Sequence, residues 1–425
     1  MKLETVFTVD AATIKYGAGV TREVGYDMRR LGCRRVMILT DAKMVDSEPV
    51  TSAMEALTLE SIEVALYDRV RVEPTDLSLK DAIRSSSERN FDGYVAVGGG
   101  STMDTAKVVN LYSSYPAPFL SYVHRPIGEG HPVPGPLKPL IAIPTTAGTG
   151  SETTGVAAFD FHETHTKAAI AHSMLRPTLG LVDPNNIRTV PRVVAACAGL
   201  DVLCGALEAI TALPYSQRPA PANPSLRPVY QGSNPISDVW AAQAIQIVSQ
   251  NLVHMIENPS DDDARDQMMM AASFGRVGIG NAGVHLPHAM SYPVSCMVRE
   301  YIPEGYSPDH PIIPHGMSVA LNAPSAFRFT AKADPRPHLH AAELMGLDTS
   351  TAHPKDAGEL LASAIVDLMR RTDMPNGLSA VGYQREDIPK LVTGTLAQER
   401  VTRLSPRSAN EADLRQLFIG NMTHW

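Results

Sequence analysis

Short apolar runs that alternate with helical stretches constrain the fold of the first 185 residues more than any other feature. The runs are Arg35–Thr40, Val64–Tyr67, Tyr94–Val97, Leu140–Ile143 and Leu179–Val182. Stretches between them, such as Leu77–Asn90, are predicted to be helical. Short apolar strands that alternate with helices indicate a mostly parallel sheet covered on both faces. We therefore predict an α/β domain over residues 1–185.

The second half of the chain has a different pattern, because the strand signal fades after about Pro191. Helical stretches are expected at Ser237–Ile256, Ala264–Phe274, Asp356–Arg370 and Glu411–Met422. In the first of them, apolar residues recur at helical spacing on one face. We predict an all-helical domain over residues 186–425. The Pro-rich segment 214–235 interrupts it and is expected to be a long ordered loop or a surface arm.

Composition excludes several classes of protein. Lys and Arg number 37 against 45 Asp and Glu, and this net charge of −8 argues against nucleic acid as the main partner. No run approaches the roughly 18 apolar residues of a membrane span, so no membrane partner is expected. The first five residues lack the features of a signal peptide or a presequence, and four scattered cysteines are too few for a disulfide framework. These features predict a cytoplasmic protein.

Three glycines, Gly98, Gly99 and Gly100, directly follow the third apolar run, and a helix is expected to begin at Ser101. Without Cβ atoms the backbone can approach a ligand closely, and a helix N-terminus presents free N–H groups. This turn suits the pyrophosphate of a dinucleotide. The alternative is a tight strand-to-helix turn without a ligand.

A second loop follows the fourth apolar run. It places hydroxyl groups or glycine at Thr145, Thr146, Gly148, Thr149, Gly150 and Ser151. In open α/β sheets, ligands bind at the carboxyl ends of the strands, although a solvated hairpin has a similar composition. Asp41 ends the first run, where a carboxylate can bind an adenosine ribose and favour NAD over NADP. A helix cap is an equal alternative for Asp41.

Acidic and imidazole side chains form the last group. Asp201 opens a predicted helix, and His285, His288 and His315 follow later in the chain. One carboxylate with two or more imidazoles suits a divalent metal ion. The spacing is not diagnostic, and packed or surface histidines are the alternative.

Taken together, these motifs resemble those of the iron-containing (group III) alcohol dehydrogenase family. The stretches that carry the resemblance are Gly98–Asp104, Pro144–Glu152, Gly199–Asp201, His288–Met290 and Pro314–Gly316. More narrowly, the chain is similar to the hydroxyacid-oxoacid transhydrogenase branch. The supporting stretches are Arg71–Asp76, Tyr230–Asp238, Gly280–His285 and Gly394–Val401.

The resemblance implies an N-terminal NAD-binding domain and a C-terminal helical domain, with nicotinamide and metal meeting between them. The residues that match NAD contacts are Asp41, Gly98, Gly99, Gly100, Ser101, Asp104, Thr145, Thr146, Thr149 and Ser151. Lys167 matches a lysine near the nicotinamide ribose. The implied catalytic residues are His288, Lys167 and His285. The implied ligands of Fe²⁺ or Zn²⁺ are Asp201, His288 and His315.

One position departs from the family pattern. A histidine ligand is implied four residues after Asp201, where this chain has Gly205. Glycine has no donor atom, so three ligands remain and the affinity for metal is expected to fall. Cys204 or His285 are the neighbouring side chains that can substitute.

The implied activity is hydride transfer from a 4-hydroxy acid, such as 4-hydroxybutyrate, to a 2-oxo acid, such as 2-oxoglutarate, through bound NAD. Both substrates carry carboxylates, which need a basic partner. Arg276 and Arg299 are candidates, with exposed surface charges as the alternative. Two other functions stay open: an NAD-dependent dehydrogenase or reductase of a short hydroxy acid or other carbonyl, and a nucleotide-binding protein that has lost catalysis. A homo-oligomer is expected from the resemblance.

Overall fold

The computed structural model describes residues 2–125, 127–163, 166–306 and 310–425. The chain divides into two compact units. The α/β unit is Ala11–Val190, and the helical unit is Met1–Asp10 together with Pro191–Trp425. The predicted ranges, 1–185 and 186–425, differ from these units chiefly in the first ten residues.

The N-terminal segment belongs to the helical unit because its backbone is bonded there. The N–H of Glu4 donates to the carbonyl O of Arg218 at 2.8 Å, and the N–H of Asp10 donates to Asn281 Oδ1 at 2.8 Å. Its other contacts lie in the Pro-rich segment, where Arg227 Nε pairs with Glu4 Oε2 at 3.0 Å. The segment 214–235 is thus an ordered loop that holds the start of the chain.

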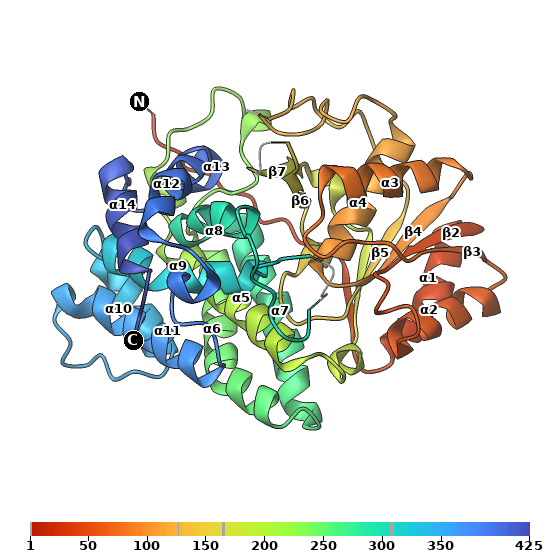
Figure 1. Ribbon diagram of the computed structural model, residues 1–425. Coiled ribbons are helices and arrows are strands. Elements are labelled where there is room, and N and C mark those ends of the chain that lie inside the picture. The colour runs from red at the N-terminus through yellow and green to blue at the C-terminus, as the bar shows by residue number, and fades with distance from the viewer. Residues whose placement is uncertain (1, 126, 164–165, 307–309) are drawn as a thin grey trace. The chain divides into compact units, whose positions relative to one another are not determined.

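A six-stranded parallel sheet forms the centre of the α/β unit, in the order β1-β8-β5-β4-β2-β3 (Figure 1). The strands are β1 (Ile14–Tyr16), β2 (Arg35–Leu39), β3 (Glu63–Tyr67), β4 (Gly93–Gly98), β5 (Leu140–Pro144) and β8 (Leu179–Val182). The α/β fold class is confirmed.

Helices cover both faces of this sheet, as Figure 1 shows. They are α1 (Val24–Arg30), α2 (Glu48–Leu59), α3 (Asp76–Ser87) and α4 (Gly100–Ser114). Alternate residues of one strand point to opposite faces. In β2, Val36 and Ile38 therefore pack with α1 and α2, while Met37 and Leu39 share a core with α4.

An antiparallel hairpin, β6 (Val156–Phe161) with β7 (Thr166–Ala171), was not predicted from the sequence. Its inward side chains, including Phe159 and Ile170, share a buried cluster with Leu111 of α4. The hairpin therefore braces the helix that begins at the triple-glycine turn.

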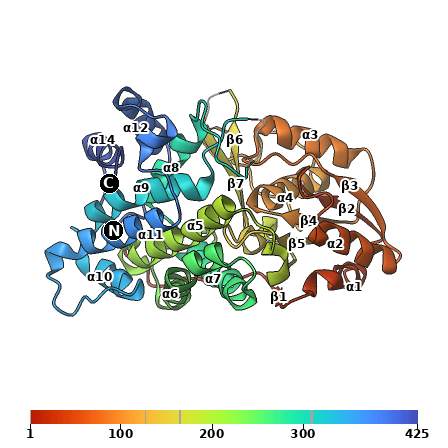
Figure 2. The same ribbon diagram turned by 60° about the horizontal axis from the view of Figure 1, so that its bottom comes forward.

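The helical unit is built around α5 (Arg192–Thr211), which is buried along nearly all of its length. The other helices are α6 (Pro235–Glu257), α7 (Asp262–Ala282), α8 (Leu286–Cys296), α9 (His315–Thr330), α10 (Pro335–Leu344), α11 (Ala357–Arg371), α12 (Ile388–Leu396), α13 (Glu399–Thr402) and α14 (Glu411–Gly420). Figure 2 shows α6 and α7 beside α5, with which both pack. The predicted all-helical character is confirmed.

By length and composition, α5 is also a candidate membrane span, a possibility that the sequence reasoning overlooked. Within its most apolar window, however, 83% of the residues are buried inside the protein. Such burial is expected of the core helix of a helical unit.

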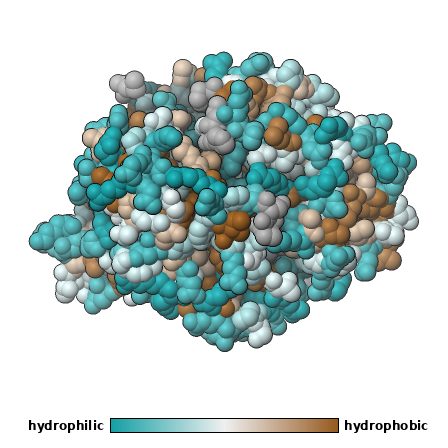
Figure 3. All heavy atoms as spheres, viewed as in Figure 1, coloured by the Kyte–Doolittle hydropathy of each residue, from teal (hydrophilic) through white to brown (hydrophobic). Residues whose placement is uncertain are grey.

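On the face shown in Figure 3, apolar residues form small groups among hydrophilic ones.

Candidate active site

Helix α5 carries three residues of the site on one face. Asp201, Gly205 and Glu208 are spaced by four and then three residues, so they lie above one another along the helix. The N-terminus of α9 approaches α5 closely at Gly316, where an added Cβ would lie 2.0 Å from the carbonyl O of Cys197. This glycine lets the neighbouring His315 reach Asp201.

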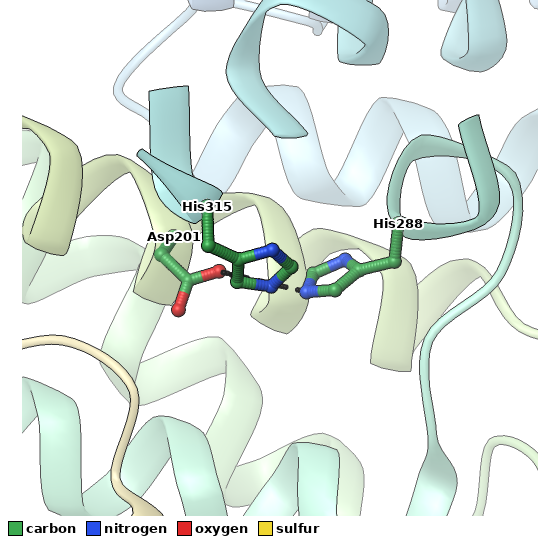
Figure 4. A group of neighbouring side chains, drawn as sticks. All are labelled: Asp201, His288 and His315. Carbon is green, nitrogen blue, oxygen red and sulfur yellow. Dashed lines mark ion pairs between the residues drawn. The ribbon is translucent and has the colours of Figure 1, made fainter. Parts of the chain in front are cut away.

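Asp201, His288 and His315 meet as a group of three donors (Figure 4). Oδ1 of Asp201 lies 3.5 Å from Nε2 of His288 and 3.7 Å from Nε2 of His315. Their donor atoms all lie within 4.8 Å of one another. Oδ1 is buried and has no hydrogen-bond partner among the residues that the structure describes. A carboxylate oxygen and two imidazole nitrogens at these separations fit a divalent metal ion.

Glu208 fixes His288 from behind, a role that sequence reasoning missed. Its Oε1 accepts from the backbone N–H groups of His285 at 2.8 Å and His288 at 3.2 Å. Its Oε2 contacts Nδ1 of the His288 ring, which leaves Nε2 directed at Asp201. Burial alone would lower the pKa of His288, but the Glu208 and Asp201 carboxylates outweigh burial and raise that pKa to about 9. The signal in the sequence was a carboxylate seven residues after Asp201, on the same helical face.

The second oxygen of Asp201 has a different partner. Oδ2 accepts from Nη2 of Arg276 on α7 at 2.7 Å. Burial would raise the pKa of Asp201, but the Arg276 guanidinium and the two imidazoles hold it well below its usual range. Arg299, the other arginine considered for the substrate carboxylate, is 55% exposed and pairs with Asp387. The structure therefore brings Arg276 to the site and leaves Arg299 at the surface.

Gly205 faces the site without a donor atom. A Cβ there would lie 2.6 Å from Cδ1 of Ile279 and 3.7 Å from Cε1 of His288. The two suggested substitutes do not fill the position. Cys204 is fully buried and outside the donor group, and burial raises the pKa of its thiol well above the usual value.

His285 is engaged at both ring nitrogens. Nε2 lies 3.0 Å from Oγ1 of Thr211, and Nδ1 accepts from the N–H of Leu286 at 2.8 Å, which caps α8. Burial lowers the pKa of His285 to about 4, so the ring is neutral near pH 7. This geometry gives His285 a capping role, and its catalytic role stays a prediction.

In the α/β unit, the two loops predicted to contact NAD lie together. Gly98 at the end of β4 pairs in register with Pro144 at the end of β5, and the N–H of Thr145 donates to the carbonyl O of Gly98 at 3.1 Å. An added Cβ at Gly100 would lie 2.6 Å from Thr149. Gly100 is thus needed for close packing between the two loops. Gly99, Gly100 and Ser101 form the N-terminus of α4, and Thr146 lies 3.6 Å from a Cβ added at Gly99.

Asp104 and Ser151 are joined by a hydrogen bond, in which the Ser151 hydroxyl donates to Oδ1 of Asp104. Oδ2 of Asp104 also accepts from the N–H of Ala158 at 2.9 Å. The fully buried Lys107, which sequence reasoning did not consider, contacts Ser151 and donates to the carbonyl O of Val156 at 2.8 Å. This network holds the second loop against α4 and β6, so these residues shape the loop.

Asp41 and Lys167, the remaining predicted residues, have partners within the same unit. Nζ of Lys167 pairs with Oε2 of Glu73 at 2.7 Å and Oδ1 of Asp160 at 2.8 Å. Oδ1 of Asp41, just beyond β2, accepts from the N–H of Lys43 at 3.0 Å. Burial raises the pKa of Asp41. The turn at Asp41 is therefore ordered by its own carboxylate.

Comparison with known proteins finds close relatives. The chain is 51% identical over 418 residues to "Hydroxyacid-oxoacid transhydrogenase, mitochondrial" of Bos taurus, covering 98% of this chain and 90% of that one. It is 52% identical over 423 residues to the protein of the same name from Xenopus tropicalis, covering 99% and 91%. These names place the relatives in mitochondria, so the predicted cytoplasmic location is wrong. Free cysteines indicate a reducing environment and do not identify a compartment.

The family models agree with these relatives. "Iron-containing alcohol dehydrogenase" matches residues 11–184, and "Fe-containing alcohol dehydrogenase family, C-terminal" matches residues 229–422. The fold is shared with a 1,3-propanediol oxidoreductase at a TM-score of 0.85 and 25% identity, covering 98% of this chain and 100% of that one. The chain therefore belongs to the iron-containing alcohol dehydrogenase family, in its hydroxyacid-oxoacid transhydrogenase branch.

Proposed function

We propose that this enzyme transfers a hydride from a 4-hydroxy acid, such as 4-hydroxybutyrate, to a 2-oxo acid, such as 2-oxoglutarate, through NAD. The observation that carries the proposal is the buried group of Asp201, His288 and His315, in a chain 51% identical to transhydrogenases over 98% of its length. The names of these relatives also support a mitochondrial location. Self-association into a dimer or larger oligomer stays a prediction.

The donor group fits the metal that the family name implies. Fe²⁺ or Zn²⁺ would be held by Asp201, His288 and His315, and when bound it would act as a Lewis acid on the substrate oxygen. Oδ1 of Asp201 supports this assignment, because it is buried, faces both imidazoles and has no hydrogen bond within the described part of the chain. Glu208 contributes by fixing the ring of His288, since a carboxylate on the far nitrogen of a ligating histidine sets its orientation.

The α/β unit supplies the NAD site in this proposal. The N-terminus of α4, at Gly99, Gly100 and Ser101, would bind the pyrophosphate through backbone N–H groups. Asp41 would accept from the adenosine ribose. Lys167 would contact the nicotinamide ribose, and the second loop would contribute the hydroxyls of Thr145, Thr146 and Thr149. Asp104 and Ser151 position that loop.

The overall reaction is balanced without an external oxidant. The 4-hydroxy acid loses a hydride and a proton and becomes an aldehyde acid, while the 2-oxo acid gains both and becomes a 2-hydroxy acid. An enzyme that keeps its NAD between the two half-reactions needs no free cofactor in solution.

The test is a substrate panel with the purified protein. We expect 4-hydroxybutyrate and 2-oxoglutarate to give 4-oxobutyrate and 2-hydroxyglutarate in equal amounts without added NAD. Added Fe²⁺ or Zn²⁺ should increase the rate. Turnover of 4-hydroxybutyrate only in proportion to added NAD would instead identify an ordinary dehydrogenase. Uptake of NAD without turnover of any hydroxy or oxo acid would identify a nucleotide-binding protein.

A further inference from the structure

Two side chains of α7 lie beside α5 near Gly205, the position that departs from the family pattern. Ile279 packs over Gly205, so that its Cδ1 lies 2.6 Å from the site of an added Cβ. One turn earlier, Arg276 contacts Asp201. The position of the missing fourth ligand is therefore filled by an apolar side chain, with a fixed cation beside it.

Arg276 has an unused donor. Its side chain is only 10% exposed, and Nη2 is bonded to Oδ2 of Asp201 at 2.7 Å. Nε is buried and has no hydrogen-bond partner in the described part of the chain. A buried N–H without an acceptor is costly, and a guanidinium prefers planar anionic oxygens. The unused donor therefore indicates a ligand that brings an acceptor oxygen.

The charges at Asp201 favour an anionic ligand. The Asp201 carboxylate faces two imidazoles through Oδ1 and the guanidinium through Oδ2. A divalent ion bound to Oδ1 and the Arg276 guanidinium would together carry three positive charges, whereas the carboxylates of Asp201 and Glu208 carry two negative charges. A substrate carboxylate or a developing alkoxide would supply the missing negative charge.

We propose that Arg276 is a substrate-binding residue whose guanidinium receives an anionic oxygen of the hydroxy or oxo acid, beside the position where Gly205 replaces the fourth metal ligand. This inference deepens the proposed function and rests on it for the identity of the acid. It assigns to Arg276 part of the positive charge that would otherwise come from a bound metal ion alone. Binding of the acid is then partly independent of metal.

The test measures binding of 2-oxoglutarate by calorimetry, which requires no turnover. Full-length protein with saturating NAD is titrated as purified and after dialysis against a chelator. Arg276→Met removes the charge, Arg276→Lys keeps it without the planar fork, and Arg299→Met is the matched control at an exposed arginine. Thermal unfolding of each variant is recorded to verify that it is folded.

We expect chelated wild-type protein to bind 2-oxoglutarate, and Arg276→Met to weaken this binding by roughly tenfold or more, since a charge-assisted hydrogen bond is lost. Arg276→Lys should weaken it less, and Arg299→Met should not change it. The inference would be overturned if Arg276→Lys, and Arg276→Met where it is folded, bound 2-oxoglutarate as tightly as the wild type. Because binding is read without catalysis, absence of transhydrogenase activity alone would count against the proposed function and not against Arg276.

Discussion

The carboxylate of Glu208 holds His288 at two points, the backbone N–H at 3.2 Å and the ring Nδ1. Both residues are buried, and the contact directs Nε2 of His288 at Asp201. In the proposed metal site, His288 would need no change of ring orientation to coordinate the ion. The orientation of the His288 ring therefore depends on Glu208, which is not itself in the donor group.

Replacing Glu208 with Gln keeps the shape of the side chain but removes its charge. We expect the metal affinity to fall roughly 10- to 100-fold, since partners behind a ligating histidine tune its orientation and basicity. Competition with a chelating dye measures this affinity. Glu359→Gln, at an exposed glutamate paired with Arg328, is the control. An unchanged affinity in Glu208→Gln would show that His288 is oriented by other contacts.

Gly205→His should restore a fourth ligand if space is provided. Because Ile279 lies close to the position, the substitution is combined with Ile279→Ala. We expect the double variant to retain more iron or zinc through purification than Ile279→Ala alone, as measured by elemental analysis. Equal metal content in the two proteins would mean that position 205 does not complete the site.

Asp41→Ala tests the choice of nucleotide. Loss of the carboxylate removes an acceptor for the ribose of NAD and a repulsive charge for the 2′-phosphate of NADP. We therefore expect NAD binding to weaken more than NADP binding in fluorescence titrations. Asp46→Ala, an exposed aspartate in the same loop, is the control. A proportional loss for both nucleotides would remove the ribose role.

The buried His338 allows a prediction of how the free energy of unfolding depends on pH. It is buried, with Nε2 2.8 Å from Oγ1 of Thr330, and burial lowers its pKa to about 4. The unfolded chain, with a histidine pKa near 6.5, binds the proton more readily, so the free energy of unfolding falls as pH drops from about 6.5 to about 4. The difference between these two pKa values corresponds to about 3 kcal/mol.

Chemical unfolding at a series of pH values measures this contribution. His338→Gln should flatten the pH dependence between pH 4 and 6.5, and His340→Gln, at a largely exposed histidine, should not. Parallel pH profiles for the wild type and His338→Gln would contradict the assignment.

The parallel sheet could be predicted because its central strands β4, β5 and β8 are largely apolar and buried along their whole length. Such strands are typical of a sheet that is covered on both faces. The donor group was anticipated from the order of family motifs, since no regular spacing connects Asp201 with His288 and His315. Their proximity is created by packing, including the close approach at Gly316.

The partners of some site residues could not be predicted, because these contacts join residues that are far apart in the sequence. The ion pair of Arg276 with Asp201 joins two helices 75 positions apart, and nothing near Arg276 in sequence marks it. The hydrogen bond of His285 could not be predicted for the same reason, because its partner Thr211 lies 74 positions earlier. Local pattern specifies an element but not the residues opposite it.

The bond between Asp10 and Asn281 has a consequence for biosynthesis. The partners are 271 positions apart, and the whole α/β unit is encoded between Asp10 and Pro191. During translation, the α/β unit is therefore complete before α7 emerges. Glu4 and Asp10 therefore leave the ribosome before the α/β unit, whereas their partners Arg218 and Asn281 follow it. The helical unit is begun first and closed last.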